Sequence, residues 1–240
     1  MDLELDPAWS IYPADRVAAV PLVVRPRVLS PQLRNYRDLI VALPPSYPGS
    51  TARYPVVYMQ DGQNLFDPAT SYAGAWHLRD TLGDLATRGV EAIVVGIPNA
   101  GNQRLYEYSP FRDPVRGGGG GDRYLAFVVE TVKPLIDAAF RTRPDRASTI
   151  VAGSSMGGLI SAYALYRLPD VFGAAGAHSP SIWFAERRLL DYLGDRADLG
   201  TGRIYFDIGL HEPEGAIADV RALRDLLLAA GRVEGRDFRY

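Results

Sequence analysis

The sequence predicts an α/β fold whose central sheet is mostly parallel, and two patterns carry that prediction. Apolar, β-branched runs at residues 54–60 and 92–97 have the length and composition of buried parallel strands, and helix-like runs alternate with such strands along the chain. Ahead of them, β-branched and polar residues alternate over residues 22–29 and 37–43, which is typical of two antiparallel strands. We therefore expect an antiparallel N-terminal hairpin followed by a parallel sheet with helices on both faces.

Turn residues and apolar spacing place the remaining elements. Residues 1–20 show no clear periodicity and are expected to form an irregular lead-in. Residues 98–121 form a long loop that ends in a glycine run, and loops of this length are usually functional or disordered. Pro134 is expected to kink the helix that contains it. After the hairpin, the expected elements are, in order, strand 54–60, helix 78–85, strand 92–97, helix 125–139, strand 149–152, helix 159–166, strand 172–177, strand 203–208, helix 217–230 and the opening of a strand at 237–240.

Composition and charge narrow the class of protein. The 240 residues are most simply one domain, residues 1–240, and their apolar content of 47% is ordinary for a globular chain. A net charge of −2 with scattered basic residues argues against a nucleic-acid partner, and the absence of cysteine excludes disulfides and Cys-ligated metals. No stretch reaches the length of a membrane span, and the acidic start lacks the pattern of a signal peptide. We expect a cytoplasmic protein with no membrane partner, of unknown oligomeric state.

A G-x-S-x-G motif centred on Ser155 lies between a strand-like and a helix-like run. A serine on a tight strand-to-helix turn holds a strained backbone, so the residues two before and two after, Gly153 and Gly157, must lack side chains. The same turn places Ser155 at a helix N-terminus, where the backbone N–H of Met156 can face a developing oxyanion. Ser155 is therefore the predicted nucleophile, and the alternative is a Gly/Ser loop that matches the motif by chance.

Five motifs, in a fixed order along the chain, together resemble the putative esterase family of the α/β-hydrolases. They read YMQDGQNLF at 58–66, EYSP at 107–110, GSSMGG at 153–158, SPSIW at 179–183 and YFDIG at 205–209. The family includes feruloyl and acetyl-xylan esterases, S-formylglutathione hydrolases, enterochelin-type siderophore esterases and mycolyltransferases. The resemblance implies an α/β-hydrolase fold over residues from about 22 to the end of the sequence, and it implies carboxylic-ester chemistry on a serine.

The resemblance also implies roles for residues outside the serine motif. The turn at Asp61-Gly62-Gln63 matches the family's second oxyanion donor, which makes the backbone N–H of Gln63 the partner of that of Met156; a plain β-turn is a compatible interpretation. The triad acid lies three residues beyond a glycine in the family, which selects Glu212 here, with Glu214 as the less favoured neighbour.

Aromatic residues are expected on loops at the carboxyl ends of strands, where ligands bind in open α/β sheets. Trp76, Tyr106 and Trp183 are the candidates for substrate binding, and Tyr72 is a further aromatic of this kind. Packing of these loops onto the sheet is an equally weighted alternative.

The sequence departs from the family's pattern in its histidines. In the family the triad histidine follows the acid, whereas His77, His178 and His211 all precede Glu212. One explanation is that the sequence is a fragment, truncated before the last strand, whose continuation carries the histidine; we favour it because the oxyanion turn, the serine motif and the acid loop all remain. A second is a protein that lacks the base. In the third, His178 substitutes as base, although a lone histidine at a strand end is more often structural.

The expected function is hydrolysis of a small-molecule carboxylic ester by a serine esterase. Ser155 attacks the carbonyl, the N–H groups of Gln63 and Met156 hold the oxyanion, and Glu212 orients a histidine. No metal or organic cofactor is expected. Acyl transfer to a sugar or a thiol uses the same serine chemistry. A catalytically impaired binding protein with the α/β-hydrolase fold is the alternative from a different class, and the missing histidine favours it.

Overall fold

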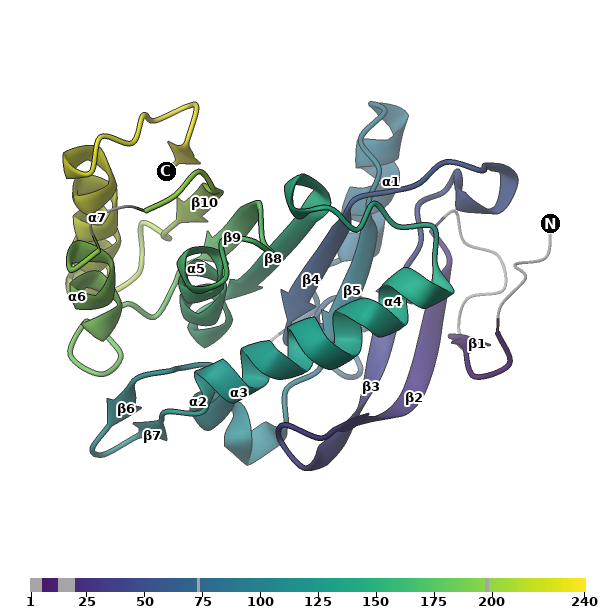
Figure 1. The fold of residues 1–240 in the computed structure, drawn as a ribbon, viewed down its shortest axis with the longest axis horizontal. Helices are drawn as coiled ribbons and strands as arrows, with labels where there is room; N and C mark the ends of the chain where they lie inside the picture. The colour runs from purple at the N-terminus through teal and green to yellow at the C-terminus, as the bar shows by residue number, and fades with distance from the viewer. Residues whose placement is uncertain (1–5, 13–19, 73, 197–198) are drawn as a thin grey trace. The chain divides into compact units, whose positions relative to one another are not determined.

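The computed structural model describes residues 6–12, 20–72, 74–196 and 199–240 (Figure 1). Contacts between Cα atoms divide the chain into two compact units. The first unit is Met1–Ala100 with Ala126–Ser148, and the second unit is Gly101–Leu125 with Thr149–Tyr240. The single domain expected from the sequence stays a prediction.

The strands of the first unit contain the expected hairpin. In spatial order they are β1 (Ser10–Ile11), β2 (Leu22–Ser30), β3 (Asn35–Ala42), β5 (Ile93–Ile97) and β4 (Val56–Gln60). The pairs β1–β2, β2–β3 and β3–β5 are antiparallel, and β4–β5 is parallel. The register of β2 on β3 shifts between Arg25 and Val28, where Pro26 cannot donate a ladder hydrogen bond and Arg27 has φ 53°. The hairpin is confirmed, and the short strand β1 lies within the segment that we expected to be irregular.

The helical part of the first unit is irregular around Pro134, as expected. α1 (Leu78–Thr87) follows the strand β4, and a π-helical stretch, Phe127–Val132, runs directly into α4 (Lys133–Ala139). Because Pro134 has no N–H, it cannot make the hydrogen bond that would continue a regular α-helix through this point. The π-helical stretch packs on the hairpin: the Arg37 guanidinium lies 5.0 Å from the Phe127 ring, and Thr131 Oγ1 donates to Gln32 Oε1 at 3.2 Å.

The second unit contains the parallel sheet that the sequence predicts. Its strands, in spatial order, are β8 (Thr149–Ser154), β9 (Ala174–His178), β10 (Arg203–Asp207) and β11 (Phe238–Arg239), and every pair is parallel. The helices that follow these strands along the chain are α5 (Met156–Arg167), α6 (Arg188–Gly194) and α7 (Glu214–Ala229). All of α5 except Arg167 is buried, so this helix forms the centre of the unit's core. The strand opening expected at 237–240 is confirmed as β11, whose Phe238 ring stacks on Phe206.

The long loop after β5 is ordered, and its glycines are sites of close packing. Within it lie α2 (Arg104–Glu107), β6 (Arg112–Asp113) and β7 (Gly117–Gly118), and the helix α3 (Gly121–Ala126) follows. A Cβ added at Gly118 would lie 2.4 Å from the carbonyl oxygen of Phe111, and one at Gly120 would lie 2.3 Å from the Tyr106 ring. The run of glycines therefore allows the backbone to approach its neighbours closely.

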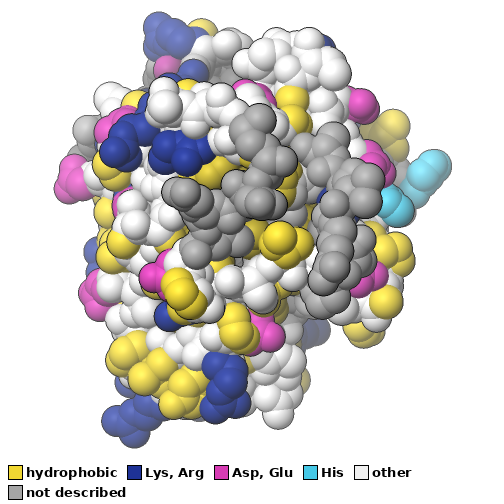
Figure 2. Space-filling view, turned by 90° about the vertical axis from the view of Figure 1, so that its right-hand side faces the viewer, with side chains coloured by type: hydrophobic (Ala, Val, Ile, Leu, Met, Phe, Trp, Pro, Cys, Tyr) yellow, Lys and Arg dark blue, Asp and Glu magenta, His cyan; other side chains and the backbone are white. Residues whose placement is uncertain are grey.

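Among the described residues, no helix is both long and apolar enough to cross a bilayer. On the face that Figure 2 shows, the Lys and Arg side chains lie in separate groups with Asp and Glu between them.

The turn between β8 and α5 depends on two glycines. A Cβ added at Gly153 would lie 2.8 Å from both the carbonyl carbon and the carbonyl oxygen of Gly157. We expect Gly153→Ala to lower the free energy of unfolding by about 1–3 kcal/mol, because the clash is with backbone atoms. Gly83→Ala is the matched control in α1, where a Cβ meets nothing within 4 Å, and it should stabilise by about 0.5–1 kcal/mol. Urea unfolding of both variants measures the difference, and equal effects would contradict the close contact.

The turn that precedes β11 is held by the carboxylate of Asp237. Its Oδ2 accepts from the Val233 N–H at 2.9 Å, and Arg236 donates to both of its oxygens. These hydrogen bonds lower the pKa of Asp237 to about 2, and the hydrogen bond from Arg236 has the largest effect.

Because this folded-state pKa lies below the ordinary value, the carboxylate stabilises the fold above about pH 4, and the contribution is lost as the pH falls toward 2. We expect the free energy of unfolding of the wild type to fall more steeply between pH 5 and pH 2 than that of Asp237→Asn. Urea titrations at a series of pH values provide the comparison. Identical pH slopes would show that Asp237 has no such role.

Candidate active site

Ser155 occupies a strained backbone position in the second unit. Its φ of 58° and ψ of −120° lie outside the regions that L-residues usually adopt, and the residue is the N-cap of α5. Three backbone hydrogen bonds hold it: its N–H donates to the His178 carbonyl at 2.9 Å, and its own carbonyl accepts from the N–H groups of Ser181 and Leu159, both at 3.0 Å. The peptide groups around Ser155 are therefore fixed on both sides, while its side chain stays partly exposed.

Met156 is the first residue of α5, so its backbone N–H lies among those that a helix leaves without an intrahelical acceptor. No acceptor for it is found among the described residues. Its Met side chain is buried, at 2% exposure, which anchors the start of the helix. An N–H in this position can stabilise a negative charge that develops next to Ser155.

The segment after β9 brings a second hydroxyl to the nucleophile candidate. Ser181 Oγ lies 3.0 Å from Ser155 Oγ, and Ser181 is buried at 2% exposure. Sequence reasoning missed this residue. The signal was present in the SPSIW motif at 179–183, but nothing in the sequence shows that this segment returns to the turn at Ser155.

His178, the substitute base considered from the sequence, is paired with a carboxylate. Its Nδ1 lies 2.8 Å from Asp207 Oδ2, and the two residues are register partners at the ends of β9 and β10. Asp207 Oδ1 also accepts from the Ser179 N–H at 3.1 Å. Asp207 was not singled out from the sequence, although parallel pairing of two adjacent strands would have placed it beside His178.

The His178 ring lies back over its own strand. The position of a Cβ at Gly176, two residues earlier on the same face of β9, is 3.7 Å from His178 Nε2. The ring centroid is 5.5 Å from that of Tyr205, the register partner of Gly176 on β10. The second nitrogen of His178 is thus directed toward the amino-terminal half of β9, whereas Ser155 follows the carboxyl end of β8.

Glu212, the predicted triad acid, lies in the loop between β10 and α7. Its N–H donates to the Gly209 carbonyl at 3.1 Å, and a Cβ at Gly209 would lie 3.3 Å from Glu212 Cγ, so the side chain folds over that glycine. Glu212 is exposed. Glu214, the less favoured alternative, is the first residue of α7.

A pocket of about 580 Å³ in the second unit contains Glu212 and Trp183 in its wall. The indole of Trp183 is 44% exposed, and the Arg116 guanidinium lies 5.4 Å from its ring. Arg187 Nε lies 2.7 Å from Asp219 Oδ1 in the same wall, an ion pair whose geometry is not that of a hydrogen bond. Burial raises the pKa of Asp219, and the charge of Arg187 opposes that shift.

The predicted second oxyanion donor, Gln63, lies in the first unit on a 3₁₀ turn, Gly62–Asn64. A Cβ at Gly62 would lie 2.4 Å from the carbonyl carbon of Gly96, so only glycine fits between this turn and β5. Asp61, at φ 56°, has its Oδ1 bonded to Asn99 Nδ2 at 2.6 Å, and Gln63 Oε1 accepts from the Asn99 N–H at 3.2 Å. These bonds fix the turn, and no acceptor for the Gln63 N–H is found among the described residues of this unit.

The other two aromatic candidates differ in their surroundings. Trp76, in the first unit, is 39% exposed, and its N–H donates to the Asn64 carbonyl at 2.9 Å. Tyr106, in the second unit, packs its ring on Gly120 and bonds through its hydroxyl to Arg123 at 3.4 Å. Tyr106 thus packs within its own loop, and substrate binding by either residue stays a prediction.

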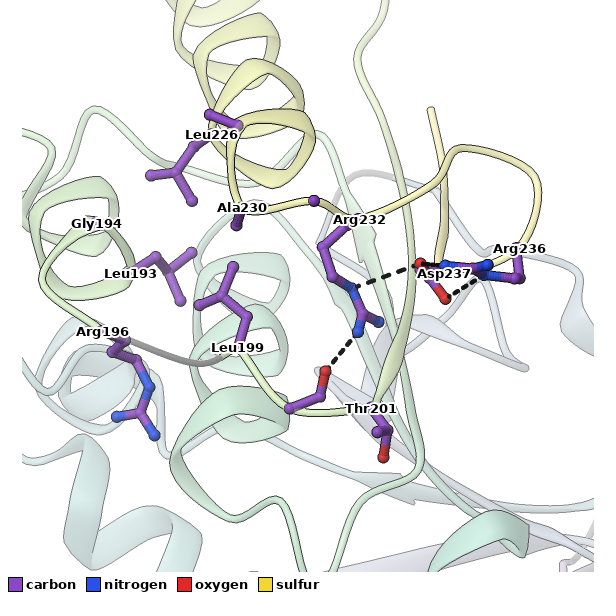
Figure 3. A pocket seen from close by; sticks show the side chains of 13 residues that line it. Leu193, Gly194, Arg196, Leu199, Thr201, Leu226, Ala230, Arg232, Arg236 and Asp237 are labelled. Carbon is purple, nitrogen blue, oxygen red and sulfur yellow. Dashed lines mark hydrogen bonds and ion pairs between the residues drawn. The ribbon is translucent and has the colours of Figure 1, made fainter.

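A second pocket, of about 630 Å³, lies at the other end of the second unit's strands (Figure 3). Leu193, Leu199 and Leu226 face one another between α6 and α7, and the Arg232 side chain lies across the far side. Arg232 donates to the carbonyls of Gly200 and Gly202 and therefore supports the chain entering β10. Since the pocket is at the amino ends of β10 and β11, it contains none of the candidate site residues.

Comparisons with known proteins agree with the motifs. The model of the family described as "Putative esterase" matches residues 30–231. A relative from Bacillus subtilis, "Uncharacterized protein YbbA", is 29% identical over 190 residues, which cover 77% of this chain and 72% of that protein. The "Siderophore triacetylfusarinine C esterase" of Aspergillus fumigatus is 34% identical over 137 residues, which cover 54% of this chain and 45% of the esterase. The chain thus spans less than half the length of that esterase.

A similar solved structure is that of an "IroE-like serine hydrolase" from Shewanella oneidensis. It superposes with a TM-score of 0.70 and 25% sequence identity, and the match covers 88% of this chain and 70% of that one. The match of the family model extends over more than half of the chain. Together with the parallel sheet and the serine turn described above, it shows that the chain belongs to the putative esterase family of the α/β-hydrolase superfamily.

Proposed function

We propose that the protein is a carboxylic-ester hydrolase that forms an acyl-enzyme on Ser155. The observation that carries the proposal is the strained backbone of Ser155 at the start of the buried helix α5, in a chain of the putative esterase family. A serine in such a turn presents its hydroxyl at the carboxyl edge of the sheet and lies beside unsatisfied helix N–H groups.

The proposed reaction has two halves. Ser155 Oγ attacks the ester carbonyl while a base takes the hydroxyl proton, the alcohol leaves with a proton, and water then hydrolyses the acyl-enzyme by the reverse sequence. The Met156 N–H stabilises the oxyanion in both halves. The N–H of Gln63 as second donor stays a prediction, supported by the fixed turn at Asp61 and by the absence of an acceptor for it in its unit.

The acid of the mechanism is Glu212 rather than Asp207. Both Asp207 oxygens already bind partners, His178 and the Ser179 N–H, whereas no hydrogen bond or ion pair of the Glu212 carboxylate is found in the part of the chain described. Glu212 is therefore available to orient an imidazole. The direction of the His178 ring supports a structural role for that residue, so we do not assign it as the base.

The substrate we propose is a small-molecule ester with a flat group that packs on Trp183. Trp183 and Glu212 share one pocket wall, so a group bound there lies next to the acid of the mechanism. Siderophore esters are the first substrates to test, because relatives named as siderophore esterases are 34% and 31% identical over the matched residues. No feature of the described residues favours acyl transfer or simple binding over hydrolysis.

Ser155→Ala tests the nucleophile in the protein as its gene encodes it. We expect hydrolysis of p-nitrophenyl acetate to fall by about 10⁴-fold or more with the fold retained, since only a hydroxyl is removed. Covalent labelling by a fluorophosphonate probe should be stoichiometric in the wild type and absent in the variant. Undiminished turnover by Ser155→Ala would remove Ser155 from the reaction.

His178→Ala separates a structural histidine from a base. If the His178–Asp207 pair only ties β9 to β10, we expect the variant to melt at a lower temperature and to retain ester hydrolysis within a few-fold. The pH profile of kcat/KM should keep its shape. If turnover falls strongly in His178→Ala, and the residual kcat/KM no longer rises with pH through the histidine range, His178 is instead identified as the base.

A further inference from the structure

The hydroxyl groups of Ser155 and Ser181 form a hydrogen bond whose direction can be deduced. Their oxygens are 3.0 Å apart, so one of the two groups donates. Ser181 is buried, and within the described residues its Oγ has no hydrogen-bond partner except Ser155 Oγ. If Ser155 donated, the Ser181 proton would be left without an acceptor in a buried position, which is unfavourable. Ser181 is therefore the donor, and Ser155 Oγ accepts.

This direction assigns every bonding position of Ser155 Oγ. A hydroxyl oxygen has one proton and two lone pairs. One lone pair accepts from Ser181, which leaves the second lone pair for attack on a carbonyl and the proton for transfer to a base. The hydrogen bond also selects one rotamer of Ser155, because rotation about its Cα–Cβ bond would break it.

We propose that Ser181 is a further catalytic residue of the ester hydrolysis proposed above, on which this inference rests. Its hydroxyl donates to Ser155 Oγ throughout the cycle and fixes the direction of attack. During acylation the free lone pair forms the C–Oγ bond, the carbonyl π electrons move to the carbonyl oxygen, and the Ser155 proton passes to the base. The carbonyl π bond then re-forms as the ester C–O bond breaks, and the alcohol leaves with the proton from the base. Ser181 keeps its own proton. In deacylation a water molecule gives a proton to the base and its oxygen bonds to the acyl carbon, the C–Oγ bond then breaks to release the carboxylic acid, and Oγ regains the proton from the base.

The hydrogen bond from Ser181 is strongest when Oγ carries most negative charge. That happens as the proton leaves in acylation and as the C–Oγ bond breaks in deacylation, whereas the oxygen of the intact acyl-enzyme is a weak acceptor. An interaction that is stronger in the two transition states than in the bound states raises kcat and leaves KM little changed. Hydrogen bonds to charged groups of this kind correspond to about a tenfold to hundredfold effect on rate.

The backbone of the same segment ensures that the hydroxyl reaches Ser155. The Ser181 N–H donates to the Ser155 carbonyl at 3.0 Å, and the His178 carbonyl accepts the Ser155 N–H. A Cβ at Gly158 would lie 3.1 Å from Pro180 Cα, so the first turn of α5 packs tightly against this segment. These contacts do not involve the Ser181 hydroxyl, and removing it should therefore leave the segment in place.

The test uses Ser181→Ala, Ser181→Cys and a matched control, Ser179→Ala, in the protein as its gene encodes it. Ser179 belongs to the same motif, but no hydrogen bond of its hydroxyl is found among the described residues. Stopped-flow measurement with p-nitrophenyl acetate gives the acylation rate constant and the saturation constant separately. Fluorophosphonate labelling gives the reactivity of Ser155 without a deacylation step, and thermal melts report the fold.

We expect Ser181→Ala to slow acylation and labelling about tenfold to hundredfold, with the saturation constant and the melting temperature little changed. Ser181→Cys keeps a weaker donor and should fall between Ser181→Ala and the wild type. Ser179→Ala should match the wild type. Unchanged acylation in Ser181→Ala, or a loss confined to the saturation constant or to the melting temperature, would overturn the role of Ser181. Failure of the esterase proposal is distinguishable, because the wild type would then show no turnover or Ser155→Ala would retain it.

Discussion

The second unit depends on holding Ser155 at positive φ. A non-glycine residue in such a conformation is strained by about 1–3 kcal/mol, so the surrounding structure must hold it there. Two backbone hydrogen bonds to residues 178 and 181 do this from one side, and the first hydrogen bond of α5 does it from the other. The contact of Gly153 with Gly157 brings the strand and the helix close enough for all three bonds to form. The strain is therefore stabilised by buried secondary structure, and the Ser155 hydroxyl contacts the hydroxyl of Ser181.

The sequence predicted most of the fold because apolar spacing determines which residues can be buried together. The hairpin, the parallel strands β8 to β11 and the helix α5 appear where apolar and β-branched residues required them. The glycine run at 117–121 was harder to interpret. Composition alone does not distinguish a flexible segment from one in which glycine permits close packing. The positions of Phe111 and Tyr106 show that these glycines permit close packing.

The candidate site could be predicted from the sequence to the extent that its geometry depends on local sequence. Ser155 and Met156 follow from one motif, since a strand-to-helix turn fixes both. Ser181 and Asp207 do not follow from a motif, because each contacts a residue that is distant in sequence and is brought near by the pairing of strands. Register decides such contacts, and a pattern of apolar residues does not determine register between parallel strands. The same reason explains why His178 could be considered as a base from the sequence: its place at a strand end was visible, but the direction of its ring was not.

The two carboxylates that follow Tyr205 have different physical roles. Asp207 joins the end of β10 to the segment after β9, because it binds both the His178 ring and the Ser179 N–H. That segment supplies the His178 carbonyl and the Ser181 hydroxyl to Ser155, so Asp207 supports the turn at Ser155 without touching it. Glu212 is beyond the strand, exposed and next to a pocket, where it can respond to a partner. A carboxylate that already accepts two hydrogen bonds, as Asp207 does, suits a fixed support. A carboxylate that orients a base must keep its oxygens available. The two carboxylates differ in this respect because Asp207 lies in the register of the sheet and Glu212 lies beyond it.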